Sequence, residues 1–204
     1  HGAVEDIQGL AEVSVAHGAW LHVDAIYGGA LAFSHRHRKL LSGLDSADSV
    51  ALGPQKWMYV PRVSSIVWVK GRDRYDRALG VELPYSATGE AHRGRWGLQG
   101  SRRADAVTLW AVLRYGGARA LGEQVDRTID LARNFWNMLS SDGLLEPTHA
   151  PDLNLLCFRY RDKDENAMRL AHQALGAHDA PWVSLSSWRE ELLLRSVLLS
   201  PRTN

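Results

Sequence analysis

Three short apolar runs, each followed by turn-forming residues, most constrain the fold of this chain. They occupy residues 20–23, 49–52 and 65–69, and the first two end at Asp24 and at Gly53-Pro54. Before the first run, apolar residues recur at helical spacing over residues 4–15, and Gly18 is a typical helix stop. A helix followed by short buried strands predicts an α/β layer with a mostly parallel sheet.

The rest of the chain also alternates between helix-like and strand-like segments. Residues 71–99 are polar and contain glycine, and so long a stretch with little periodicity predicts a functional or mobile loop. Helices are expected at 104–115 and 118–139. Strands are expected at 154–160 and 192–199, with a helix at 165–175 between them. A domain boundary is expected between residues 133 and 143.

Composition narrows the class of protein. The chain has 204 residues, and its 24 basic and 23 acidic residues give a formal net charge of +1. So small an excess does not favour nucleic acid or an anionic membrane as a partner. No apolar stretch is long enough for a membrane span. Cys157, the only cysteine, lies in an apolar run, so we expect it to be buried in a cytoplasmic protein. The start at His1, without Met or a signal peptide, predicts that the chain continues upstream.

Asp24 and Lys56 are the residues that suggest chemistry. Each closely follows a predicted buried strand, and ligands of open α/β sheets bind beyond the carboxyl ends of the strands. Pyridoxal phosphate requires a lysine amine for its Schiff base and an aspartate beside its pyridine nitrogen. The opposite charge favours the protonated nitrogen, which makes the ring a better electron acceptor. Taken singly, Asp24 also fits a helix cap and Lys56 a solvated side chain.

Other sites find less support in the sequence. His22, His35 and His37 do not have a recognised metal-ligand spacing, so no metal is expected. The serines at 64 and 65 lack the G-x-S-x-G context of a serine hydrolase. The basic run 35–39 is interpreted as solvated surface. Trp20, Trp57, Trp110 and Trp136 fall in apolar patterns and are interpreted as core residues.

Four segments, in order along the chain, resemble motifs of the group II pyridoxal-phosphate-dependent amino-acid decarboxylases. Residues 20–29 read W-L-H-V-D-A-I-Y-G-G, and residues 47–50 and 54–57 read A-D-S-V and P-Q-K-W. Residues 98–106 read L-Q-G-S-R-R-A-D-A and are followed by Leu109-Trp110, and residues 200–203 read S-P-R-T. The family includes aromatic amino-acid, histidine, glutamate and diaminobutyrate decarboxylases.

The resemblance implies roles for individual residues. Lys56 would form the Schiff base with pyridoxal 5'-phosphate, and Asp24 would pair with the pyridine nitrogen. Ile26 would pack against the ring, where the family carries a smaller residue. Gln55 replaces the family's usual histidine, so it can donate a hydrogen bond but cannot titrate. Gly53 stands where some members have an asparagine that helps to hold the phosphate.

The resemblance also implies an architecture. Residues 1–138 would be part of the α/β large domain of a fold-type I pyridoxal-phosphate-dependent transferase-like fold, without its N-terminal half. Residues 139–204 would be a small α+β C-terminal domain without its last helix. The 71–99 segment would close over the cofactor of the other subunit in a homodimer. Arg93 falls where aromatic amino-acid decarboxylases carry a catalytic tyrosine, so it is a candidate catalytic residue.

The implied reaction is α-decarboxylation of an L-amino acid to the amine and carbon dioxide. Three other reactions remain open on the same fold: those of an aminotransferase, an aldehyde-forming deaminase and a carbon–carbon lyase. A further possibility is an inactive fragment, because the family's first half supplies much of the phosphate-binding site.

Overall fold

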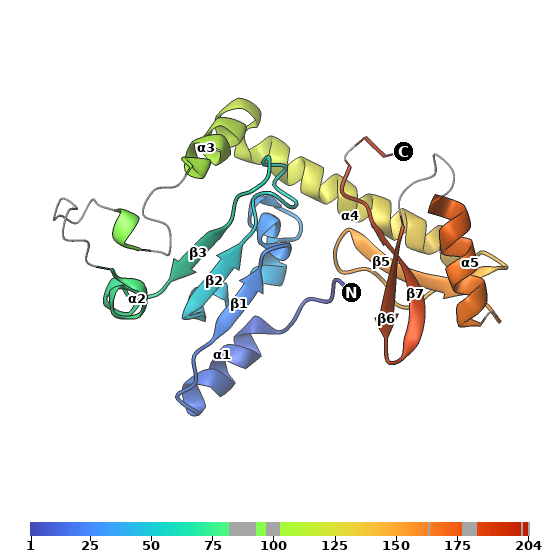
Figure 1. Cartoon of the computed structure of the whole chain (residues 1–204), viewed down its shortest axis with the longest axis horizontal. Coiled ribbons are helices and arrows are strands. Elements are labelled where there is room, and N and C mark those ends of the chain that lie inside the picture. Colours follow the sequence, from blue (N-terminus) through green and yellow to red (C-terminus); the bar gives the residue numbers. More distant parts are fainter. Residues whose placement is uncertain (82–92, 97–102, 163, 177–182, 201, 204) are drawn as a thin grey trace. The chain divides into compact units, whose positions relative to one another are not determined.

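The structure is a computed structural model, and it describes residues 1–81, 93–96, 103–162, 164–176, 183–200 and 202–203 (Figure 1). The chain forms two compact units. The N-terminal unit comprises residues 6–33 and 38–121, and the C-terminal unit comprises residues 1–5, 34–37 and 122–204. The division near residue 121 falls in the first turn of helix α4 (Ala118–Ser140). The domain boundary expected from the sequence at 138/139 stays a prediction.

A three-stranded sheet organises the N-terminal unit. Its strands lie in the order β1 (His22–Ala25), β2 (Ser49–Leu52) and β3 (Ile66–Val69). β1 and β2 are parallel, and their crossover contains three short 3-10 helices, η1 (Gly28–Phe33), η2 (Arg38–Leu41) and η3 (Leu44–Ser46). β3 is antiparallel to β2, so the expectation of a mostly parallel sheet is wrong there. The reason is the connection over residues 53–65, which contains turns and no helix that could return the chain for a parallel strand.

Helix α1 (Ile7–Ala16) confirms the first predicted helix. The Asp6 side chain caps it by accepting a hydrogen bond of 3.1 Å from the Gly9 N–H. Ile7 and Ala11 are buried, one turn apart on the same face. The apolar residues at helical spacing therefore mark the face of α1 that packs within this unit.

The segment 71–99 is not a continuous loop, which corrects the sequence-based expectation. Residues Arg72–Leu79 form helix α2, and Arg93–Arg95 form the short 3-10 helix η4. The Tyr75 hydroxyl donates a hydrogen bond of 3.1 Å to the Trp96 carbonyl, and the Val81 N–H donates one of 2.9 Å to the Arg95 carbonyl. These contacts, which the sequence pattern does not reveal, hold the described part of the segment together. Residues 82–92 and 97–99 lie outside the described part.

Helix α3 (Asp105–Gly116) follows in the N-terminal unit, as predicted. It has no buried residue, and Trp110 is 64% exposed, so the interpretation of Trp110 as a core residue is wrong. Trp20 is also 48% exposed, and its indole N–H donates to the Ser49 hydroxyl at 2.8 Å. Trp57, in contrast, is fully buried as expected.

The C-terminal unit combines α4 with an antiparallel sheet and a second helix. The strands lie in the order β4 (Leu145–Pro147), β5 (Leu155–Tyr160), β7 (Glu191–Val197) and β6 (Ser184–Trp188). Helix α5 (Glu165–Gly176) connects β5 toward β6. α4, α5, β5 and β7 match the predicted elements, whereas β4 and β6 were not predicted.

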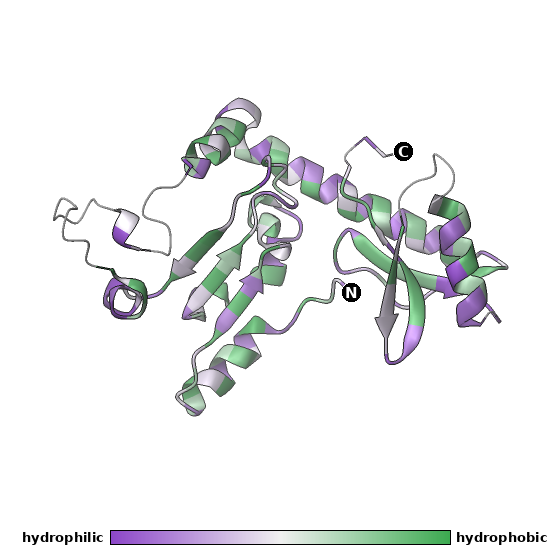
Figure 2. Cartoon of the chain, in the orientation of Figure 1, coloured by the Kyte–Doolittle hydropathy of each residue, from purple (hydrophilic) through white to green (hydrophobic). Residues whose placement is uncertain are grey.

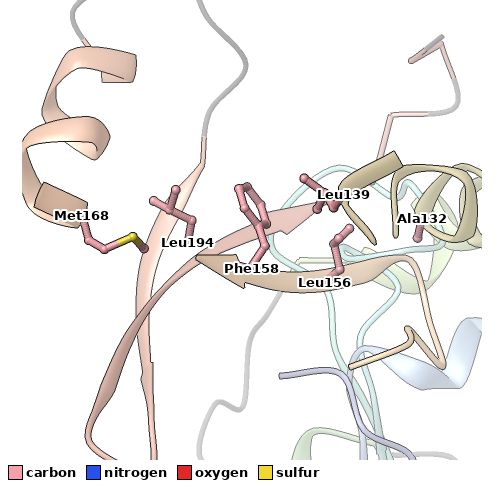
Figure 3. Close-up of a cluster of buried hydrophobic side chains, with 6 residues drawn as sticks. All are labelled: Ala132, Leu139, Leu156, Phe158, Met168 and Leu194. Atoms are coloured by element: carbon pink, nitrogen blue, oxygen red, sulfur yellow. The ribbon is translucent and has the colours of Figure 1, made fainter. Parts of the chain in front are cut away.

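The core of the C-terminal unit lies between its helices and its sheet. Figure 2 shows hydrophobic and hydrophilic residues interleaved around α4, as expected for a helix with one buried face. Figure 3 shows the central cluster, to which α4, α5 and two strands contribute. Its buried members are Ala132, Leu139, Leu156, Phe158, Met168 and Leu194. Cys157, also on β5, is buried in a separate cluster with Leu155 and Leu193. Burial raises the pKa of its thiol, as expected for a structural cysteine.

The basic run at 35–39 is not simply solvated surface. Arg36 makes two hydrogen bonds of 2.7 Å to the Asp130 carboxylate on α4. The Ser34 hydroxyl donates to Asp126, one turn earlier on the same helix. His37 is 9% exposed, and its pKa is lowered, chiefly by burial and then by the charge of Arg133. Ser34 and Arg36 thus bind α4 within the C-terminal unit. His35, Arg36, Arg38 and Lys39 are exposed, so the interpretation of the run as solvated surface is wrong only for His37.

Within the described residues, no helix combines the length and apolarity needed to cross a membrane. The cytoplasmic location expected from the sequence stays a prediction.

Candidate active site

The carboxyl ends of β1 and β2 bring the two candidate catalytic residues to one edge of the sheet. The parallel register pairs Asp24 with Ala51 and Ala25 with Leu52. Asp24 is therefore near the end of β1, and Lys56 lies in the turn that directly follows β2. Both side chains are exposed at this edge. Parallel strands end at the same side of a sheet, which is where α/β folds bind ligands.

The Asp24 carboxylate is oriented by its own loop. Its Oδ1 accepts a hydrogen bond of 3.0 Å from the Ile26 N–H, so the chain turns sharply after the aspartate. Among the described residues, Oδ2 accepts no hydrogen bond. One oxygen is therefore fixed by the backbone, and the other remains available to a positively charged ring nitrogen.

The Lys56 turn is fixed by backbone hydrogen bonds. The Lys56 N–H donates to the Gly53 carbonyl at 2.9 Å, and the Val60 N–H donates to the Pro54 carbonyl at 3.1 Å. Trp57 is fully buried directly after the lysine. In the described part of the chain, Lys56 forms no ion pair with Asp24 or with another carboxylate. An exposed amine and an exposed carboxylate at one edge of the sheet are the two groups that pyridoxal phosphate requires.

Ile26 and Gly53 lie close together where the two loops meet. A Cβ built on Gly53 would collide with the Ile26 carbonyl oxygen and would lie 2.9 Å from the Ile26 Cγ2. Glycine is thus required at position 53 by the approach of the Ile26 backbone. The predicted cofactor-binding residues Ile26 and Gly53 are brought together at the active-site edge.

Gln55 connects the Lys56 turn to the next strand. Its Oε1 accepts a hydrogen bond of 2.9 Å from the Ser64 N–H, just before β3. The oxygen of Gln55 therefore accepts a hydrogen bond within the protein, and its amide N–H groups are the donors of this side chain.

Arg93 is the predicted site residue about which the structure says least. Its backbone begins η4, but its side chain lies outside the described part of the chain. The structure therefore does not bring Arg93 together with Asp24 and Lys56.

Two aromatic residues at the site have a contact that the sequence-based reasoning did not assign. The rings of Tyr27 and Trp57 stack with their centroids 5.3 Å apart and their planes at 27°. Tyr27 follows Asp24 by three positions, and Trp57 follows Lys56 directly. Because both residues lie inside the motifs that carry Asp24 and Lys56, the sequence offered a signal that could have pointed to them.

Residues 1–161 match the family described as the pyridoxal-dependent decarboxylase conserved domain. The chain belongs to the pyridoxal-dependent decarboxylase family. The family assignment expected from the four motifs is therefore confirmed, and the dependence on pyridoxal and the decarboxylase class are in the family's description.

Individual relatives agree with this membership. The chain is 33% identical to an aromatic-L-amino-acid decarboxylase of Drosophila simulans over 153 residues, which are 73% of this chain and 30% of that protein. It is 27% identical to a phenylacetaldehyde synthase of Arabidopsis thaliana over 98% of this chain and 44% of that protein. The chain thus spans less than half the length of these relatives.

The fold has close counterparts among solved structures. The crystal structure of Oryza sativa TDC with PLP and tryptamine superposes with a TM-score of 0.89 at 24% identity. The match covers 98% of this chain and 44% of that one. The predicted α/β fold of the fold-type I decarboxylases is thereby confirmed.

Proposed function

We propose that this chain supplies the lysine and the aspartate of a pyridoxal 5'-phosphate site that catalyses α-decarboxylation of an L-amino acid, giving the amine and carbon dioxide. The observation that carries the proposal is the position of Asp24 and Lys56 after adjacent parallel strands, in a chain of the pyridoxal-dependent decarboxylase family. We propose this reaction for the whole protein that contains the chain, with Asp24 and Lys56 in its active site.

Lys56 would hold the cofactor covalently through its amine, and Asp24 would keep a proton on the pyridine nitrogen through its carboxylate. When bound, pyridoxal phosphate supplies an electron-accepting ring for the electrons left by the departing carboxylate. The Asp24 carboxylate favours this role because it stabilises the positive charge on the ring. Ile26 would pack against the ring, and Gly53 and the amide of Gln55 would help to hold the cofactor at the Lys56 turn.

Arg93 completes the proposed set of catalytic residues. An arginine remains protonated at any working pH, so it is a poor proton donor and is suited to orient a carboxylate or a water molecule. We further propose that residues 1–138 belong to the large cofactor domain and residues 139–204 to the small domain, and that the protein acts as a homodimer. Exposed apolar residues on α3, including Val107 (59%) and Trp110 (64%), support a further contact surface.

An aldehyde-forming reaction is the second candidate. The supporting observation is the 27% identity to a phenylacetaldehyde synthase over 98% of this chain. Product analysis separates the two, although both release carbon dioxide. An amine formed without uptake of dioxygen supports simple decarboxylation. An aldehyde and ammonia, formed with consumption of dioxygen and release of hydrogen peroxide, support the second candidate.

The direct test of the site is chemical labelling of the full-length gene product. Borohydride reduction in the presence of pyridoxal phosphate should attach the cofactor to the peptide that contains Lys56. Lys39 and Lys70 provide internal controls on neighbouring peptides. Recovery of the label on either of these lysines, with none on Lys56, would contradict the assignment.

A further inference from the structure

The separation of the two loops that carry the site residues needs a physical cause. Asp24 and Lys56 make no ion pair with each other in the described structure. Asp24 lies in β1, one residue before its end, whereas Lys56 lies beyond the end of β2. Backbone pairing of β1 and β2 ends at Ala25 and Leu52, before Lys56 is reached. A cofactor held at both ends requires the carboxylate and the amine to be placed within about 0.5 Å.

We propose that the stacked pair of Tyr27 and Trp57 is a positioning device that sets the spacing between the Asp24 carboxylate and the Lys56 amine. The inference rests on the proposed function, because it concerns the same cofactor site. Tyr27 and Trp57 are positioning residues, since they act through their neighbours in the chain.

The path from each ring to its functional group is short. The Ile26 N–H, bonded to Asp24 Oδ1, lies on the residue directly before Tyr27. On the other side, Trp57 directly follows Lys56 and is fully buried, so the lysine backbone cannot shift without moving this ring. A displacement of one ring relative to the other therefore changes the distance between carboxylate and amine.

The neighbouring contacts limit how closely the loops approach and do not replace the ring pair. Gly53 lies against the Ile26 carbonyl, and Gly29 lies against the Leu52 side chain, in both cases without room for a Cβ. These contacts are steric limits. The stacked rings supply a specific attraction with a preferred offset, which determines where within those limits the loops rest.

The test compares Tyr27→Phe with Tyr27→Leu in the full-length gene product loaded with pyridoxal phosphate. Both substitutions remove the hydroxyl, so their difference measures the ring alone. The free energy of one aromatic pair corresponds to a roughly 2- to 13-fold change in a dissociation constant. We therefore expect Tyr27→Leu to bind the cofactor about 3- to 10-fold more weakly than Tyr27→Phe. The pH dependence of the bound cofactor's absorbance should shift in Tyr27→Leu only.

Phe135→Leu is the matched control. Phe135 and Phe158 form an aromatic pair with centroids 5.6 Å apart in the C-terminal unit. Its loss should lower the melting temperature and leave the cofactor dissociation constant and the pH profile unchanged. If Tyr27→Leu does not fold, Tyr27→Met replaces it, because methionine adapts to irregular space.

The outcomes separate the inference from the proposed function. If borohydride does not label Lys56 in the wild type, the proposed function fails. If the wild type is labelled but the leucine and phenylalanine variants share one dissociation constant and one pH profile, the ring pair does not position the site. An equal weakening in Phe135→Leu would also overturn the inference, because the effect would then be one of general stability.

Discussion

Replacing Gly53 with alanine adds one methyl group where the Lys56 turn meets the Asp24 loop. The new Cβ would collide with the Ile26 carbonyl oxygen and lie 2.9 Å from its Cγ2 and 3.2 Å from its carbonyl carbon. Two of these three atoms belong to the backbone, so a rotamer change cannot relieve the contact. Overpacking of this kind costs about 1–3 kcal/mol, and we expect about 2–3 kcal/mol here.

The substitution also has a favourable component. Alanine reduces the conformational entropy of the unfolded chain, which stabilises the folded protein by about 0.4–1 kcal/mol where the backbone accepts it. The net loss for Gly53→Ala is therefore about 1–2.5 kcal/mol. This would correspond to a fall in melting temperature of about 2–10 °C for a protein of 150–250 residues, and we expect a smaller fall in a longer gene product.

Gly28→Ala is the control, because Gly28 begins η1 in the facing loop. A Cβ at Gly28 would meet no atom within 4 Å, and the position belongs to a helical turn that alanine adopts readily. We expect an unchanged or slightly raised melting temperature. Thermal unfolding of the wild type and both variants of the full-length gene product measures the difference. A Gly53→Ala protein as stable as Gly28→Ala would refute the close approach of the two loops.

Three further predictions follow from other residues. Asp24→Asn should retain the cofactor on Lys56 but lose most turnover, because an amide cannot hold the ring nitrogen protonated. An assay of product formation checks this. Activity within a few-fold of the wild type would contradict it. The pKa of His37 is lowered in the folded state, so the wild type should lose stability as the pH falls below about 6.5. Urea unfolding should show that His37→Gln loses less free energy of unfolding than the wild type between pH 7.5 and 5.5. Leu156→Ala, at a fully buried position in the C-terminal unit, should cost about 2.7–5.0 kcal/mol, and a loss below about 1 kcal/mol would argue against the packing in Figure 3.

Elements whose signal is local could be predicted from the sequence. β2 begins and ends where the apolar run 49–52 predicts, because four apolar or small residues are bounded by a Gly-Pro stop. β1 lies two residues later than predicted, at His22–Ala25. Its limits depend on which residues pair with β2, and that pairing is a tertiary property.

The hairpin of β6 and β7 shows why other elements were missed. Two-residue hairpin turns with positive φ at both positions usually carry Asn-Gly or Asp-Gly. Here the turn residues are Arg189 and Glu190, with φ of 50° and 68°. β6 itself contains three serines and has a weak apolar pattern. Neither the turn nor the strand therefore has a strong local signal.

Long-range partners explain the contacts at the basic run that the sequence did not predict. Arg36 and Ser34 bind Asp130 and Asp126, which lie more than 90 positions away in the sequence. Local composition alone favours solvent for such a run. The same holds at the candidate site. The sequence identified Asp24 and Lys56 by their residue types and positions, but it could not predict that the Tyr27 ring stacks on Trp57.

Gly53 shows how the structure changes the meaning of a departure from the family pattern. Compared with members that carry asparagine, this glycine removes a group that helps to hold the phosphate, which would suggest that Gly53→Asn restores affinity. The structure predicts the opposite, because asparagine has a Cβ and that atom would collide with the Ile26 carbonyl. The turn would have to open before the amide could donate to a phosphate. We therefore expect Gly53→Asn to weaken cofactor binding relative to the wild type, measured by titration of pyridoxal phosphate absorbance. If Gly53→Asn binds the cofactor more tightly than the wild type, the Asp24 loop must move away from position 53 at Ile26 when the phosphate is bound.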